Sequence, residues 1–215
     1  MLYYGVGKHG PFLPMRCKRD VMYNLFTMIN QSNWMSYENA QPKEQDFFAY
    51  DLELGRAFMS VGSTLHSFAF PFTLRVDEHA RHAYAYWRCF SIDSAVASLA
   101  VSVLQGPTDP FANLSETVLG VAVDYFTDSN IDLNAVVDML SYLSNLDDGY
   151  FRQDCDAEHE NGHIHPANHI DLYHADRISL KFGLSEPLTM ETLRGLVNKG
   201  EPAFYLRSMD ASARS

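Results

Sequence analysis

Strand-like and helical patterns occupy separate blocks of this chain. Alternating, aromatic-rich segments fill residues 46–92, helical spacing of apolar residues fills 94–146, and short alternating segments return at 150–183. Strands that alternate strictly with helices are typical of a parallel sheet, whereas separate blocks favour an antiparallel one. The sequence therefore predicts an α+β fold, in which a mostly antiparallel sheet is covered by an antiparallel helix pair and further helices.

The helices are predicted from apolar residues spaced three and four apart and from signals at their ends. Asp20 is expected to cap the first helix, and Asp93 or Ser94 starts the second, which Gly106 ends. The antiparallel pair is expected within residues 110–146. The expected helices cover about residues 20–30, 94–106, 114–125, 133–143 and 190–200.

The strands are predicted from two-residue alternation and aromatic enrichment. Residues 77–81 are read as a hairpin turn, and "YYGVGKHG" near the start as an irregular arm. His66 falls inside an aromatic strand, where a hydrogen-bonded core or interface histidine is expected. The expected strands cover residues 46–55, 64–77, 82–92, 150–156, 169–174 and 178–183.

Composition limits the class of protein. With 47% hydrophobic residues the chain can bury a large core, which predicts a single domain over residues 1–207 and a frayed tail over 208–215. The net charge of -11 argues against broad binding to a phosphate backbone, because that mode needs an excess of lysine and arginine. A local basic patch is still compatible with this charge.

Cysteine usage and hydropathy predict a cytoplasmic protein without a membrane segment. Cys17, Cys89 and Cys155 are odd in number and far apart, which fits buried free thiols in a reducing compartment. The first 20 residues lack the pattern of a secretory signal. The longest uncharged stretch, which starts at Ser94, is shorter than the roughly 18 apolar residues of a spanning helix.

The stretch "HENGHIHPANHIDLYH", residues 159–174, holds five of the nine histidines. Side chains two residues apart on a strand point to the same face. Arg152 therefore shares a face with Asp154, and His169 with Asp171. If the last three strands are neighbours, these four residues and Lys181 lie on one surface, as a site for proton transfer or anion handling requires.

Three interpretations of this cluster are open. A solvated hairpin would leave the histidines without a specific role. In a metal-free site, His165 or His169 is the acid or base and is oriented by Asp154 or Asp171, while Arg152 or Arg177 binds an anionic group. In a metal site, zinc or manganese is bound by His163, His165 and His169 together with Asp171 or Asp154.

The order of residues in "YFRQDCD … HPANHIDLYHADR" resembles uncharacterised bacterial proteins of mobile and defence loci, including small toxin-like families. The likeness covers about 40 residues at the end of the core and none of the first 145. It implies a cytoplasmic effector that attacks nucleic acid or nucleotides, with Arg152, Asp154, His165 and His169 at the recurring positions.

Two functions from different classes are predicted. The first is an intracellular effector with a histidine-centred hydrolytic or phosphotransfer site for nucleic acid or nucleotides. Arg152, Asp154, His165, His169 and Asp171 would be catalytic there, and Arg177 and Lys181 would bind the substrate. The alternative is an acidic, non-enzymatic binding module that occupies a partner's basic surface, as an inhibitor, immunity protein or complex subunit would.

Overall fold

The computed structural model describes residues 1–7, 10–43, 46–127, 129–162, 164–172 and 180–201. In this part of the chain, ten strands and five α-helices form an α+β fold, which confirms the predicted class. The predicted tail, residues 208–215, lies outside the described residues.

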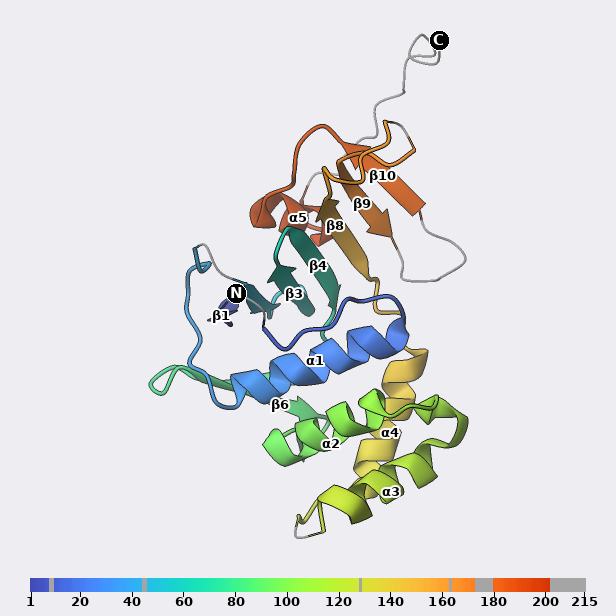
Figure 1. Cartoon of the computed structure of the whole chain (residues 1–215). Helices are drawn as coiled ribbons and strands as arrows, with labels where there is room; N and C mark the ends of the chain where they lie inside the picture. Colours follow the sequence, from blue (N-terminus) through green and yellow to red (C-terminus); the bar gives the residue numbers. More distant parts are fainter. Residues whose placement is uncertain (8–9, 44–45, 128, 163, 173–179, 202–215) are drawn as a thin grey trace.

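Seven strands form one sheet in which all neighbours are antiparallel, in the order β1-β2-β3-β4-β8-β9-β10 (Figure 1). Their bounds are β1 Leu2–Gly5, β2 Phe47–Asp51, β3 Arg56–Val61, β4 Thr64–Ala69, β8 Phe151–Cys155, β9 Asn168–Leu172 and β10 Leu180–Leu184. A second sheet contains β5 Thr73–Asp77, β6 His82–Trp87 and β7 Phe90–Ser91.

Several predicted strand boundaries were wrong. The predicted strand 46–55 ends at Asp51, because the Asp51 carboxylate accepts the backbone N–H groups of Glu53 and Leu54 and closes a turn before β3. The predicted strand 64–77 divides at Pro71 between the two sheets, since proline cannot donate to a strand ladder. The arm near the start contains β1, which pairs with β2.

The chain also turns inside the predicted strand 82–92. Arg88 adopts a positive φ of 54°, and this separates β6 from β7. The strand-forming residues were recognised correctly there, but the tight turn between them was not.

The helices lie where their apolar spacing predicts. Their bounds are α1 Lys18–Ser32, α2 Ser94–Gln105, α3 Leu114–Tyr125, α4 Leu133–Asn145 and α5 Met190–Val197. Asp93 caps α2 as predicted, with its carboxylate accepting two backbone N–H groups. The predicted cap of α1 was wrong: Cys17 is the N-cap, and Asp20, one turn later, accepts its backbone N–H.

The large sheet has helices on both faces. On one face, Tyr4, Phe48 and Met59 belong to the core that includes the buried side of α1. On the other, Phe58, Leu65 and Phe151 pack with Met190 and Leu193 of α5. The helix pair α3–α4 packs against α2 and α1, below the large sheet in Figure 1. In the described part of the chain, we find no helix whose length and hydropathy would suit a membrane span.

Candidate functional site

Polar side chains follow two cross-strand rows on the sheet face that also carries Met59. In the first row, Met59, His66, Arg152, Asp171 and Lys181 stand opposite one another on successive strands. The second row runs from Val61 through Thr64, Asp154 and His169 to Gly183. The last three strands are therefore neighbours, and the predicted common surface of the five charged or ionisable residues is confirmed.

Arg152 bridges the two carboxylates of this surface. Its Nε lies 2.8 Å from Oδ2 of Asp154, and its Nη2 donates to Oδ2 of Asp171 at 2.5 Å. Burial opposes the charged guanidinium, but the two carboxylates and Tyr150 outweigh it and raise the pKa of Arg152. Arg152 is thus held in place by both acids.

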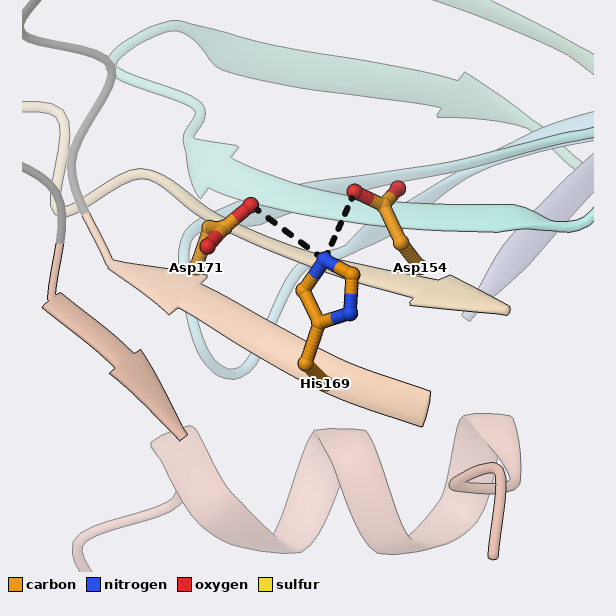
Figure 2. A group of neighbouring side chains, drawn as sticks. All are labelled: Asp154, His169 and Asp171. Carbon is orange, nitrogen blue, oxygen red and sulfur yellow. Dashed lines mark ion pairs between the residues drawn. The ribbon is translucent and has the colours of Figure 1, made fainter. Parts of the chain in front are cut away.

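His169 is fixed at the centre of the group. Its side chain is 1% exposed, and its Nδ1 lies 2.8 Å from the backbone carbonyl of Pro166. A carbonyl only accepts, so Nδ1 carries a proton and donates it, which leaves Nε2 to face the other groups of the site. Nε2 points between Asp154 and Asp171, at 3.4 and 3.7 Å from their Oδ2 atoms (Figure 2).

Lys181 places its ammonium group against both histidines. Its Nζ lies 3.1 Å from Nδ1 of His165, 3.2 Å from Nε2 of His169 and 3.8 Å from Oδ1 of Asp171. An ammonium group has three donors and no acceptor, so both ring nitrogens receive hydrogen bonds from it. Lys181 thus supplies a positive charge where the two lone pairs converge.

His165 differs from His169 in its access to solvent. Its side chain is 30% exposed, and its Nε2 lies 3.5 Å from Oδ2 of Asp156. A hydrogen bond from His159 is the main cause that lowers the pKa of Asp156, with a smaller contribution from His165. The His165 side chain is therefore more exposed than that of His169, although its Nε2 atom is itself buried and its Nδ1 contacts Lys181.

The predicted metal ligands are only partly brought together. Among the described residues, Asp154, His169 and Asp171 form a group that could hold a metal ion, with one ligand atom from each within 4.8 Å of the others. Two carboxylates thus join His169 there, while His165 stands behind Lys181. His163 and Arg177 lie outside the described residues.

Sequence reasoning missed the neighbours of this group on β4. His66 is buried opposite Arg152, and its Nδ1 lies 3.1 Å from the Tyr150 hydroxyl, so the predicted hydrogen-bonded core histidine is confirmed. Burial, with a smaller effect of the Arg152 charge, lowers the pKa of His66 to about 3. Only the pairing of β4 with β8 reveals this proximity, and no local motif encodes that pairing.

The geometry can therefore hold a cation, orient the imidazole of His169 and place a second, more exposed imidazole beside it. The resemblance to toxin-like families of defence loci stays a prediction, because comparisons with protein-family models, with curated proteins and with solved structures find no match to this chain.

Proposed function

We propose that this protein is an intracellular hydrolase or phosphotransferase that acts on nucleic acid or nucleotides at the Asp154–His169–Asp171 group. The observation that carries the proposal is the convergence of three ligand atoms within 4.8 Å beside Arg152 and Lys181. Phosphoryl transfer needs cationic groups around the transferred phosphate and a base for the attacking oxygen. This surface offers both kinds of group.

A divalent metal, zinc or manganese, is the proposed cofactor. Imidazole and carboxylate ligands suit both ions, and the hydrogen bond from His169 to the Pro166 carbonyl is the outer contact that metal-binding histidines usually make. A bound metal polarises a phosphoryl oxygen and acidifies a coordinated water. Lys181 would then have to leave Nε2 of His169, and its ammonium group would pair with the substrate phosphate.

His165 is the proposed base. It is the more exposed of the two histidines, and Asp156 lies on the far side of its ring from Lys181. A carboxylate in that position stabilises the imidazolium that forms when the ring takes a proton. His169, which is buried, would bind the metal instead of exchanging protons.

The test combines elemental analysis with hydrolysis assays. We expect the purified protein to contain about one zinc or manganese per chain and to release phosphate or cut strands when given nucleotides, single-stranded RNA or single-stranded DNA. Asp154→Asn and His165→Gln should lower the rate at least about 100-fold, the usual size of an acid–base contribution. Glu116→Gln, at an exposed acidic position of α3 and outside the large sheet, is the matched control.

Two results would contradict this proposal. One is an equal rate of hydrolysis in Asp154→Asn and in the Glu116→Gln control, because the Asp154 carboxylate would then have no role in the reaction. The other is the absence of hydrolysis by metal-loaded wild-type protein with all three substrate classes.

A second candidate function is supported by the negative charge of the segment that contains α2, α3 and α4. Between Arg88 and Arg152 the chain has nine acidic residues and no lysine, arginine or histidine: Asp93, Asp109, Glu116, Asp124, Asp128, Asp132, Asp138, Asp147 and Asp148. Leu119 and Val123 are also exposed on α3, at 54% and 59%. An acidic segment with exposed aliphatic side chains suits a basic protein surface.

This binding module would function without the histidine group. Substitution of both Glu116 and Asp124 by lysine, which reverses their charge, should then abolish the effect of the protein in its host cell. Asp154→Asn should leave that effect intact. The hydrolase proposal predicts the opposite pattern for the same two variants, so one assay of both variants separates the candidates.

A further inference from the structure

A cavity of about 190 Å³ opens beside the Arg152–Asp154 pair. The loop of residues 12–15 forms one wall, and Met59 and Val61 of β3 form a second. The polar side consists of Thr64 and His66 of β4 with Arg152 and Asp154 of β8. Asp154 belongs both to this cavity and to the group of three ligand atoms, so the two features share one boundary.

The wall opposite the sheet is held in a fixed position. The backbone N–H of Leu13 donates to Oδ1 of Asn24 at 2.9 Å, and Nδ2 of Asn24 donates to the Leu13 carbonyl at 2.7 Å. Asn24 is fully buried in α1. The Tyr150 hydroxyl also approaches the Met15 carbonyl, at 3.5 Å. The cavity is therefore formed before any ligand arrives, as is usual for small-molecule sites.

The lining selects for a flat, uncharged and polar ring. Apolar side chains from residues 12–15, Met59 and Val61 suit the faces of such a ring. Along the polar side, Thr64 offers a hydroxyl and His66 a neutral imidazole, since burial holds the pKa of His66 near 3. Arg152 is already engaged with the carboxylates of Asp154 and Asp171. A charged group would gain little in this cavity, whereas a ring with its own donors and acceptors would find partners.

Size narrows the ligand further. Sites for whole drug-sized ligands measure about 300 to 1,000 Å³, so a cavity of about 190 Å³ takes one ring system and leaves the rest of the molecule outside. The rest of the ligand would then lie over the next strands, where Lys181 contacts His165 and Asp171. A phosphate suits that position and not the cavity itself, whose walls are mostly apolar.

We propose that this cavity binds the unpaired base of a nucleotide, with the phosphate of that nucleotide over the Asp154–His169–Asp171 group. The proposal rests on the proposed function and names its substrate class. The base can come from a free nucleotide or from a single strand, because both present an unpaired ring. A base inside a duplex is excluded, since its ring faces are stacked and its edge is paired.

Isothermal titration of the metal-free protein tests the proposal without any turnover. The probes are the four nucleoside 5′-monophosphates, ribose 5-phosphate, a single-stranded tetranucleotide and a self-complementary duplex. We expect at least one monophosphate or the tetranucleotide to bind at least tenfold more tightly than ribose 5-phosphate, and the duplex to bind no better than ribose 5-phosphate. The stronger of the two nucleotide ligands identifies the source of the base.

Val61→Phe fills the cavity. It should lower the affinity for nucleotides to that for ribose 5-phosphate and leave the affinity for ribose 5-phosphate unchanged. Val123→Phe, the same change at an exposed position of α3, is the matched control. Thr64→Val alters one hydroxyl without added volume, so it guards against misfolding of Val61→Phe, and it should weaken base binding several-fold.

Equal affinity for ribose 5-phosphate and all nucleotides, or no binding of any probe, would overturn the inference. So would an undiminished preference for the base in Val61→Phe and Thr64→Val. Failure of the proposed function looks different: tight, base-dependent binding would then persist, but the metal-loaded wild type would hydrolyse none of its substrates. Conversely, equal turnover of ribose 5-phosphate and nucleotides would keep the hydrolase and remove the base pocket.

Discussion

The ammonium nitrogen of Lys181 lies 3.2 Å from Nε2 of His169. This Nε2 is the atom through which His169 would bind a metal, because its Nδ1 is engaged by the Pro166 carbonyl. An ammonium group and a divalent metal at the same lone pair exclude each other. The protein therefore carries an internal cation at the position where a metal would bind.

Removal of that cation should improve metal binding. We expect Lys181→Met to bind zinc at least about tenfold more tightly than the wild type, a gain of ~1.4 kcal/mol, because the metal no longer displaces a charge of its own sign. Titration with zinc chloride and with manganese chloride, followed by calorimetry, measures the change. Lys181→Arg retains the charge and should bind zinc with the affinity of the wild type. Equal affinities in Lys181→Met and Lys181→Arg would disprove the competition.

Arg152 should be essential for stability as well as for chemistry. Without it, the carboxylates of Asp154 and Asp171, 17% and 8% exposed, lose their shared guanidinium. Removal of one partner from a buried ion pair costs about 3–5 kcal/mol, and the 31% exposure of Arg152 reduces this to about 2–3 kcal/mol for Arg152→Met. Urea unfolding at pH 7 measures the loss.

A second substitution shows whether charge is the cause. In Arg152→Met combined with Asp171→Asn, only one of the two carboxylates remains, so about 1 kcal/mol or more of the loss should return. If the double variant is as unstable as the sum of the two single variants, the guanidinium stabilises the protein through packing and not through charge.

The face of this site was predictable, but its neighbours were not. Two-residue alternation places Arg152 with Asp154 and His169 with Asp171, and this holds whichever strands pair. The position of His66 beside Arg152 depends on pairing between β4 and β8, which are separated by the whole helix block. Alternation fixes the direction of a side chain and carries no information about the partner strand.

The same distinction explains the errors in the fold. Helical periodicity located α2 to α5 well, since each repeats the same apolar spacing over at least two turns. Turns rest on single residues: Pro71 moves the chain from one sheet to the other, and Arg88 turns it with a positive φ. An arginine at such a turn gives no signal that sequence reasoning can use.

Arg194 should hold α5 on the sheet. Its Nε donates to Asp51 at 2.5 Å and its Nη2 to Glu53 at 2.7 Å, while the Asp51 side chain is 1% exposed and that of Glu53 is 81% exposed. Arg194→Ala leaves a buried carboxylate without its cation and should cost about 2–3 kcal/mol in urea unfolding. Glu53→Gln removes only an exposed pair, and a loss of at most about 0.5 kcal/mol is expected. Similar losses in the two variants would count against the buried pair.

His66 should make the protein less stable in mild acid. Its folded pKa is about 3, whereas an unfolded histidine titrates near 6.5. Between these values the unfolded chain binds a proton that the folded chain does not, so this contribution to stability is lost as the pH falls, by up to ~1.4 kcal/mol per pH unit. At pH 4.5 the loss should reach about 2–3 kcal/mol relative to pH 7.

His66→Gln isolates this contribution, because glutamine does not titrate and can still pair with the Tyr150 hydroxyl. Urea unfolding at pH 7 and pH 4.5 should show a drop in stability that is about 2–3 kcal/mol smaller in His66→Gln than in the wild type. His79→Gln, at an exposed turn position, should follow the wild type at both pH values. If His66→Gln loses as much stability between pH 7 and pH 4.5 as His79→Gln, His66 takes up its proton in the folded protein. The polar side of the cavity would then not be neutral.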